Sequence, residues 1–210
     1  MNLHHPFDDT LARYAAGRLG AGPSLVVATH LTGCAECRVR VGLFEATGGA
    51  LLAETPAERV APEMFAANLA RLDAPSRGKA PPPARRGSEF PSPLDQIEMP
   101  PWRKVGRGFE WRRLTLPYAP DANVIMLKVA PGRNIPQHTH SGVEYTQVLK
   151  GSFHDSLGRY VAGDCVEADE DVDHQPIVDS EGECICLAAV EGRLLLQGWI
   201  GRVVQRFIGI

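Results

Sequence analysis

Three residues that can bind a metal ion lie close together in the second half of the chain. They are His138, His140 and Glu144, with Gly132 before them and Gly151 after them. Side chains alternate along a β-strand, so histidines at positions i and i+2 project from the same face. A short break follows, where the chain can turn and bring the carboxylate to the same point. This spacing predicts a metal site.

His174 is a fourth candidate ligand, further along the chain. Three imidazoles and one carboxylate suit a divalent first-row metal, and zinc, iron, manganese and nickel all accept such ligands. The alternative is a polar loop with incidental histidines. A single His-x-His would favour that alternative, but the added glutamate and the flanking glycines favour a metal site.

A second group of ligand types occurs in the first half of the chain, as His30, Cys34 and Cys37. On an unbroken helix these three positions share one face. If Gly33 breaks the helix, His30 ends one helix and the two cysteines begin the next. Both arrangements bring the three side chains together. The second also places the thiols at a helix N-terminus, where the helix dipole favours the thiolate.

These three ligands need a fourth to close a tetrahedral zinc site. His4 and His5 can supply it, and because neighbouring side chains of an extended segment point in opposite directions, only one of them should bind. The alternative is a pair of buried thiols beside a helical histidine. The chain has five cysteines, and this odd number together with the Cys-x2-Cys favours metal binding or thiol chemistry in a reducing compartment over disulfides.

Cys184 and Cys186 are a further pair with a defined spacing. At positions i and i+2 of a predicted strand, their side chains point to one face. They are either small core residues or a redox-sensitive pair near the metal site of the second half.

The patterns that must position these residues change twice along the chain. Residues 1–72 predict about four short helices, the first beginning at the capping side chains of Asp8–Thr10. The last carries an apolar stripe of Phe65, Leu69 and Leu72, which fits core packing and a partner-binding face equally well. Residues 73–93 are rich in proline and predict a semi-rigid, extended linker. Residues 94–210 predict many short strands without alternating helices, the last over 194–199, which is typical of a β-barrel or sandwich. The predicted fold class is multidomain, α followed by all-β.

The composition excludes several function classes. The net charge is −3, which predicts no general attraction to nucleic acid. The first half shows no basic stripe and lacks zinc-finger spacing, which argues against a DNA-binding zinc module. The sequence has no apolar run long enough for a membrane span and no secretion-signal pattern. We therefore expect a cytoplasmic protein that makes no contact with membranes.

The pattern Gly-x5-His-x-His-x3-Glu-x6-Gly over residues 132–151 resembles the first motif of the cupin superfamily. Gly163 and His174 resemble its second motif, with Val-Ala-Gly in place of the usual Pro-x-Gly. Cupins are small β-barrels that bind a metal in the mouth of the barrel. The resemblance therefore implies that residues 94–210 form a cupin domain whose metal is held by His138, His140, Glu144 and His174.

His-x3-Cys-x2-Cys with an N-terminal histidine, on a bundle of about four helices, resembles zinc-binding anti-sigma domains. Joined to a C-terminal cupin, it resembles the ChrR-type anti-sigma factors over nearly the whole chain. In that family the second residue of an N-terminal histidine pair is a ligand, which implies His5 rather than His4. The zinc ligands implied for the helical domain are His5, His30, Cys34 and Cys37.

The resemblance implies regulation rather than turnover. The helical domain, residues 1–72, would bind and inhibit a group IV (extracytoplasmic-function-type) sigma factor, and the cupin domain would mediate release in response to an oxidative stress signal. The competing hypothesis is a metal-dependent cupin enzyme, an oxygenase or isomerase, with an accessory zinc domain. No motif in the sequence marks an additional general acid or base. The sequence leaves open the inducing signal, the cupin metal and the oligomeric state.

Overall fold

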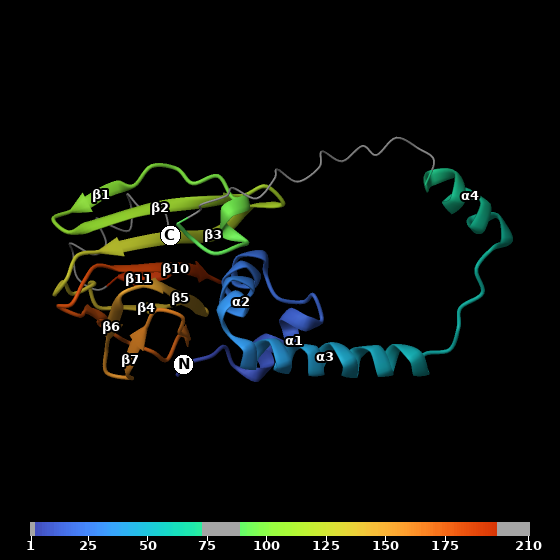
Figure 1. Ribbon diagram of the computed structural model, residues 1–210, viewed down its shortest axis with the longest axis horizontal. Helices are drawn as coiled ribbons and strands as arrows, with labels where there is room; N and C mark the ends of the chain where they lie inside the picture. The colour runs from blue at the N-terminus through green and yellow to red at the C-terminus, as the bar shows by residue number, and fades with distance from the viewer. Residues whose placement is uncertain (1–2, 73–88, 197–210) are drawn as a thin grey trace.

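The computed structural model describes residues 3–72 and 89–196, in which four α-helices are followed by a β-rich part, as predicted (Figure 1). The helices are α1 (Asp8–Ala15), α2 (Ala21–Gly33), α3 (Ala35–Glu54) and α4 (Pro62–Leu72), and a 3-10 turn, η1 (Leu94–Gln96), precedes the strands. Residues 73–88 of the predicted linker lie outside the described residues, so the domain limits at 72 and 94 stay predictions.

The strands of residues 89–196 form three antiparallel sheets around one cavity. The large sheet has the order β1-β2-β3-β10-β5-β8, and the smaller sheets have the orders β7-β6-β9 and β11-β4. The strands are β1 (Arg103–Gly106), β2 (Phe109–Leu116), β3 (Ala119–Val129), β4 (His138–His140), β5 (Glu144–Lys150), β6 (Ser152–His154), β7 (Arg159–Val161), β8 (Cys165–Ala168), β9 (Ile177–Val178), β10 (Cys184–Val190) and β11 (Leu194–Leu196). The strand predicted over 194–199 is present as β11, and its last three residues lie outside the described residues.

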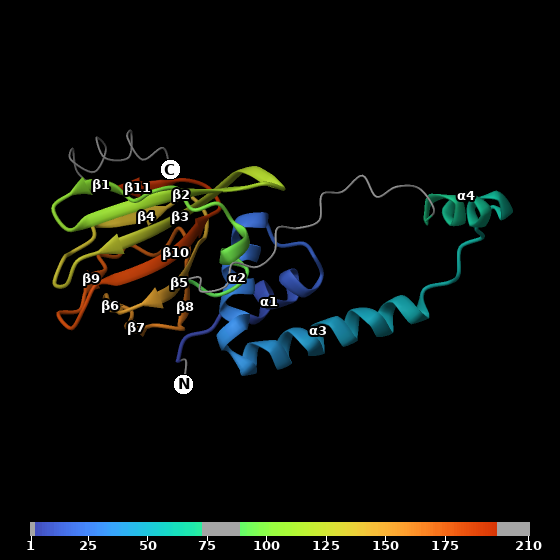
Figure 2. The ribbon, with the colours of Figure 1, turned by 45° about the horizontal axis from the view of Figure 1, so that its top comes forward.

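The two faces of the large sheet have different neighbours. On β10, Cys184 and Cys186 line the cavity, whereas Ile185 and Leu187 belong to a core shared with the helices. This alternation follows from the two-residue period of a strand. The inner face of the sheet therefore surrounds the cavity, and the helices cover part of its outer face (Figure 2).

Helix α2 lies at the centre of the contact between the helices and the barrel. It is apolar around most of its circumference, as a helix must be if it is buried on several sides. A Cβ atom on Gly22 would meet Val124 at 3.0 Å and Ala189 at 3.2 Å, so this glycine lets the helix approach the sheet closely. The helical part and the barrel thus share one hydrophobic core, whose members include Leu11, Leu25, Val26, Leu94, Leu114, Met126, Tyr145 and Leu187.

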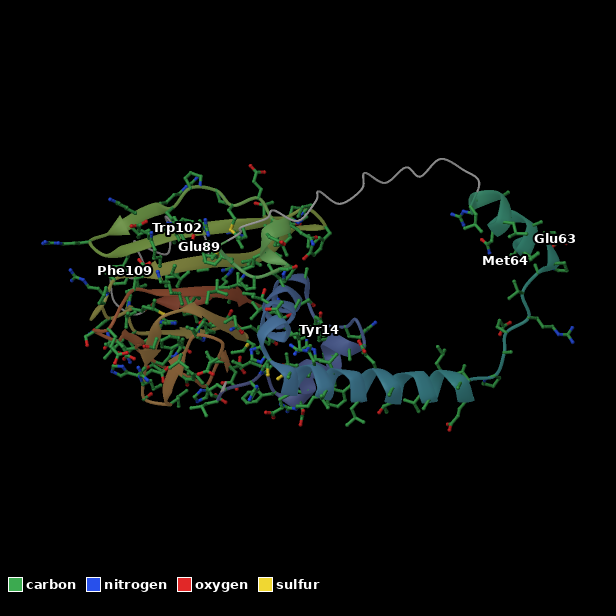
Figure 3. The ribbon with its side chains drawn as sticks, viewed as in Figure 1. Tyr14, Glu63, Met64, Glu89, Trp102 and Phe109 are labelled. Atoms are coloured by element: carbon green, nitrogen blue, oxygen red, sulfur yellow. The ribbon has the colours of Figure 1, made fainter. Side chains whose placement is uncertain are left out.

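Helix α4 is the last of the four predicted helices, and it is exposed along its whole length. None of its eleven residues, all of which the structure describes, is buried. The helix stands apart from the rest of the described chain, with Glu63 and Met64 projecting from it (Figure 3). The packed helices are α1, α2 and α3, and α2 also contacts β3, β5 and β10 of the barrel.

The start of α1 differs from the prediction. The helix begins at Asp8 itself, and the residue before it, Phe7, offers no side-chain cap within the described chain. Instead, the carboxylate of Glu167 on β8 accepts hydrogen bonds from the Phe7 N–H (2.8 Å) and the Thr10 hydroxyl (2.9 Å). These two bonds tie the start of α1 to β8, but they serve the Phe7 N–H and the Thr10 hydroxyl rather than the N–H groups that an N-cap side chain would serve.

Candidate metal centres

The structure brings the four predicted cupin ligands together. His138 and His140 are the ends of β4, and Glu144 is the first residue of β5. His174 lies beside His138 in a two-way backbone bridge, with both N–H···O distances at 3.1 Å. One ligand atom from each of the four side chains lies within 4.8 Å of the others, as a single bound ion requires.

Hydrogen bonds of two of these histidines place a proton on Nδ1. Nδ1 of His138 donates to the carbonyl of Pro136 (2.8 Å), and Nδ1 of His174 donates to a carboxylate oxygen of Asp155 (2.9 Å). In the neutral rings, Nε2 therefore carries a lone pair. The two Nε2 atoms are only 3.1 Å apart. Burial lowers the pKa of His138, but its hydrogen bond with Glu144 outweighs this and raises the pKa, so without a metal its Nε2 holds a proton that faces Glu144 and His174. A metal ion at this point would take the place of that proton.

The electrostatics of this site suit metal binding. Burial alone would raise the pKa of Glu144, but hydrogen bonds from His138 and His140 hold that pKa well below its ordinary value. Burial lowers the pKa of His174. An ionised carboxylate and a neutral imidazole are the forms that coordinate a metal.

The cupin cavity has a volume of about 100 Å³ and a mainly apolar lining. Phe153 and Val178 form part of its wall, and Cys184 and Cys186 form another part, with their sulfur atoms 3.6 Å apart. The expectation that these cysteines share a face is confirmed. A hydrogen bond with Cys184, together with burial, raises the pKa of Cys186 well above its ordinary value, so the Cys186 thiol stays protonated in this environment.

The second cluster forms where α2 meets α3. Cys34 ends α2 and caps α3, and its sulfur accepts a hydrogen bond from the Cys37 N–H at 3.4 Å. The break after Gly33 is therefore the second of the two predicted arrangements, with both thiols at a helix N-terminus. Burial and a hydrogen bond with Cys34 raise the pKa of Cys37 to about 12. A bound cation is needed to favour its thiolate.

His4 and His5 point in opposite directions, as expected of an extended segment. Nδ1 of His5 lies 3.4 Å from the Cys34 sulfur and 3.3 Å from the Cys37 sulfur. His4 instead pairs with Asp164 at 3.2 Å. The structure thus places His5, not His4, with His30, Cys34 and Cys37, and one ligand atom from each of these four side chains lies within 4.8 Å of the others.

His30 completes the cluster from the last turn of α2. Its Nδ1–H donates to the side-chain oxygen of Gln147 (3.0 Å) and the carbonyl of Gly163 (3.1 Å), both of which belong to the barrel. Its Nε2 is buried and has no hydrogen-bond partner among residues 3–72 and 89–196. A buried lone pair without a partner is costly, and a metal ion at the cluster would satisfy it. Two thiols and two imidazoles are a donor set found in tetrahedral zinc sites.

Gln147, Gly163 and Asp155 are the partners that the sequence analysis missed. Asp155 is hydrogen-bonded to His174 and lies 19 residues before it in the chain. Gln147 is hydrogen-bonded to His30 and lies 117 residues after it. No local spacing relates these residues to the ligands. An alignment in which the glutamine and its histidine vary together is the kind of signal that finds such pairs.

The fold and these two clusters define a class of protein in which a small helical metal site packs against a cupin-type barrel with a second site. Residues 94–191 match the family model described as the ChrR cupin-like domain. The chain is 38% identical over 213 residues to the anti-sigma-E factor ChrR of Cereibacter sphaeroides, covering 99% of this chain and 98% of that one. The chain belongs to the ChrR family of anti-sigma factors.

The fold is also similar to a solved structure, that of Rhodobacter sphaeroides SigE in complex with the anti-sigma ChrR. The TM-score is 0.73 at 37% sequence identity, and the match covers 91% of this chain and 100% of the other. The likeness therefore extends across both the helical part and the barrel. Within the part of the chain that the structure describes, no helix has the length and hydrophobicity of a membrane span.

The two clusters predict two metal ions per chain, each bound by its own ligand set. Cys34→Ala with Cys37→Ala should remove one ion, and His138→Ala with His140→Ala should remove the other, because the two ligand sets share no residue. Elemental analysis of the purified proteins measures this. A wild-type protein with one ion, or a double variant that keeps both ions, would contradict the assignment.

Proposed function

We propose that this protein binds and inhibits a group IV sigma factor through its helices, and that its cupin barrel governs release of the sigma factor. The observation that carries the proposal is the match to an anti-sigma factor over 99% of the chain. The two ligand clusters of this chain are His5, His30, Cys34 and Cys37, and His138, His140, Glu144 and His174. A relative with the same two-part fold is described in a complex with its sigma factor. Because a sigma factor acts on RNA polymerase, we also propose that the protein works in the cytoplasm.

The helices offer an apolar surface for such a partner. Beyond its first two turns α3 is largely exposed, and α4 is exposed throughout. Phe65, Leu69 and Leu72, the predicted stripe of α4, are 72%, 48% and 79% exposed. Exposed apolar surface of this extent marks an interaction site. The exposed apolar side chains of the two helices also include Val39, Leu43, Leu51, Leu52 and Met64.

We propose that the metal of the helical cluster is zinc. Helices α1 to α3 supply only a small core of their own, and a structural zinc ion contributes folding free energy to units of this size. The cupin site, with three imidazoles and one carboxylate, suits zinc, iron, manganese or nickel. His5, His30, Cys34 and Cys37 hold the first metal, and His138, His140, Glu144 and His174 hold the second.

The barrel is proposed to respond to an oxidative signal rather than to turn over a substrate. Its metal and the Cys184/Cys186 pair line one cavity, so both are placed where a small oxidant that enters the cavity would meet them. Oxidation of a packed thiol pair adds polar bulk to the cavity wall and would bias the barrel toward a different conformation. A few kcal/mol of bias is enough to change which of two conformations is populated.

Residues 1–72 should suffice for inhibition, because this segment contains the complete helical ligand set and both exposed helices. The fragment is added to its sigma factor in an in vitro transcription assay with RNA polymerase. We expect transcription to fall as the fragment approaches a one-to-one ratio with the sigma factor. The matched control is the same fragment with Cys34→Ala and Cys37→Ala, which should not inhibit. Full transcription at excess wild-type fragment would contradict the prediction.

Cupin-ligand variants should separate inhibition from release. His140→Ala, Glu144→Ala and His174→Ala should each leave inhibition in place and blunt induction by an oxidant, because they change only the barrel site. A reporter under a sigma-dependent promoter, with and without oxidant, measures both properties. Cys184→Ser and Cys186→Ser should also blunt induction if the thiols participate in sensing, and should act like wild type if they only pack. Wild-type induction in all three ligand variants would reject the sensing role and favour the enzyme hypothesis.

A further inference from the structure

Strand β5 contacts both metal clusters, one with each face. Glu144 ligates the cupin cluster and Thr146 lines the same cavity. Their neighbours Tyr145 and Gln147 point the other way, where Tyr145 joins the core shared with the helices and Gln147 meets His30. Glu144 and Gln147 are three positions apart, which is about 10 Å along a strand. A single short strand therefore spans the distance between the two sites.

Gln147 is held in a defined orientation. Its side chain is 4% exposed, and its Nε2 donates to the carbonyl of Val148 at 3.1 Å. This bond leaves the side-chain oxygen as the acceptor that faces His30. An acceptor at this place keeps the proton of His30 on Nδ1 and the lone pair on Nε2, the nitrogen that is available to the metal. Together with the carbonyl of Gly163, which accepts from the same N–H, the glutamine sets the tautomer and the direction of the ring.

Strand β8, which pairs with β5, helps to position His5, the other histidine of the helical cluster. The N–H of Cys165 donates to the carbonyl of His4 at 3.1 Å, and Asp164 accepts from the N–H groups of Leu3 (2.9 Å) and His4 (3.3 Å). These bonds position the segment from which His5 reaches the cluster. The two cysteine ligands come from the α2–α3 junction, whereas both histidine ligands are positioned by the barrel.

We propose that Gln147 is a positioning residue for the helical metal site, and that through β5 it makes retention of that metal depend on whether the cupin site is occupied. The inference rests on the two metal sites of the proposed function. When the cupin metal is present, Glu144 is fixed at the start of β5 as a ligand. When it is absent, Glu144 is held by contacts such as those with His140 (2.6 Å) and Thr146 (3.1 Å) instead of by a coordinate bond, and this end of the strand is less tightly fixed. Gln147 then loses its alignment with His30.

Cobalt substitution in the full-length protein separates the two sites. Cobalt bound by thiolates gives a sulfur-to-metal charge-transfer absorption, and the cupin ligands contain no thiolate, so this absorption reports on the helical site alone. Its decay after addition of excess EDTA gives the rate of metal loss. The variants are Gln147→Leu, which removes the acceptor, and Gln147→Glu, which retains one with nearly the same shape. Gln96→Leu is the matched control, because Gln96 is an exposed glutamine near α2 that lies outside the cluster.

We expect Gln147→Leu to lose cobalt about tenfold faster than wild type or more, as is usual when the hydrogen-bond partner of a metal ligand is removed. Gln147→Glu and Gln96→Leu should behave like wild type. Wild-type retention in Gln147→Leu would overturn the positioning role. A merely structural defect would speed cobalt loss from both Gln147 variants alike. Equal rates of loss from Gln147→Glu and Gln147→Leu would therefore also overturn the positioning role.

Dependence on the cupin site is tested in a protein with His138→Ala and His140→Ala. This protein should lose cobalt from the helical site faster than wild type, and adding Gln147→Leu should give little further increase, because both changes break the same connection. Unchanged release in the cupin variant, or rate increases that multiply, would overturn the coupling. Inhibition of the sigma factor is measured on the same preparations before EDTA is added. If the cobalt results hold while wild type fails to inhibit, the failure lies in the proposed function and not in the coupling.

Discussion

The imidazole of His30 has two nitrogens, and each serves a different part of the molecule. Nδ1 donates to Gln147 and Gly163 of the barrel, and Nε2 faces the cluster at the α2–α3 junction. The ring is 1% exposed, so both nitrogens must be satisfied within the protein. The placement of α2 on the sheet, the tautomer of the ring and the geometry of the metal site therefore depend on one another. A helix that moved off the barrel would expose or orphan this side chain.

This dependence explains how a small helical unit can carry a metal site without a large core of its own. Its buried residues merge with those of the sheet, and the start of α1 is hydrogen-bonded to Glu167 of β8. The surfaces that remain uncovered, the far part of α3 and all of α4, are those that suit a partner. In an anti-sigma factor this arrangement leaves the apolar helices available for binding while the metal cluster stays in contact with the barrel that is proposed to sense the signal.

Features that arise from local spacing were predictable from the sequence, and features that arise from packing were not. Histidines at i and i+2, or cysteines at a helix start, converge because of strand and helix geometry. The helical ligand set, including His5, followed from the family resemblance, and the structure brings its members together. Gln147 and Asp155 escaped notice because their roles depend on contacts between distant segments. The apolar stripe of α4 was predictable, but its role in the core or at a partner was left open, because such a stripe indicates burial without saying which molecule provides it.

The central claim is that two thiolates and two imidazoles hold a metal at the junction of the helices and the barrel. Zinc K-edge X-ray absorption of the full-length protein with His138→Ala and His140→Ala tests it most directly, because only the helical site then contains metal. The account predicts two sulfur ligands at about 2.3 Å and two imidazole nitrogens at about 2.0 Å. A spectrum with two sulfurs and one imidazole, with water or a carboxylate in the fourth place, would contradict it.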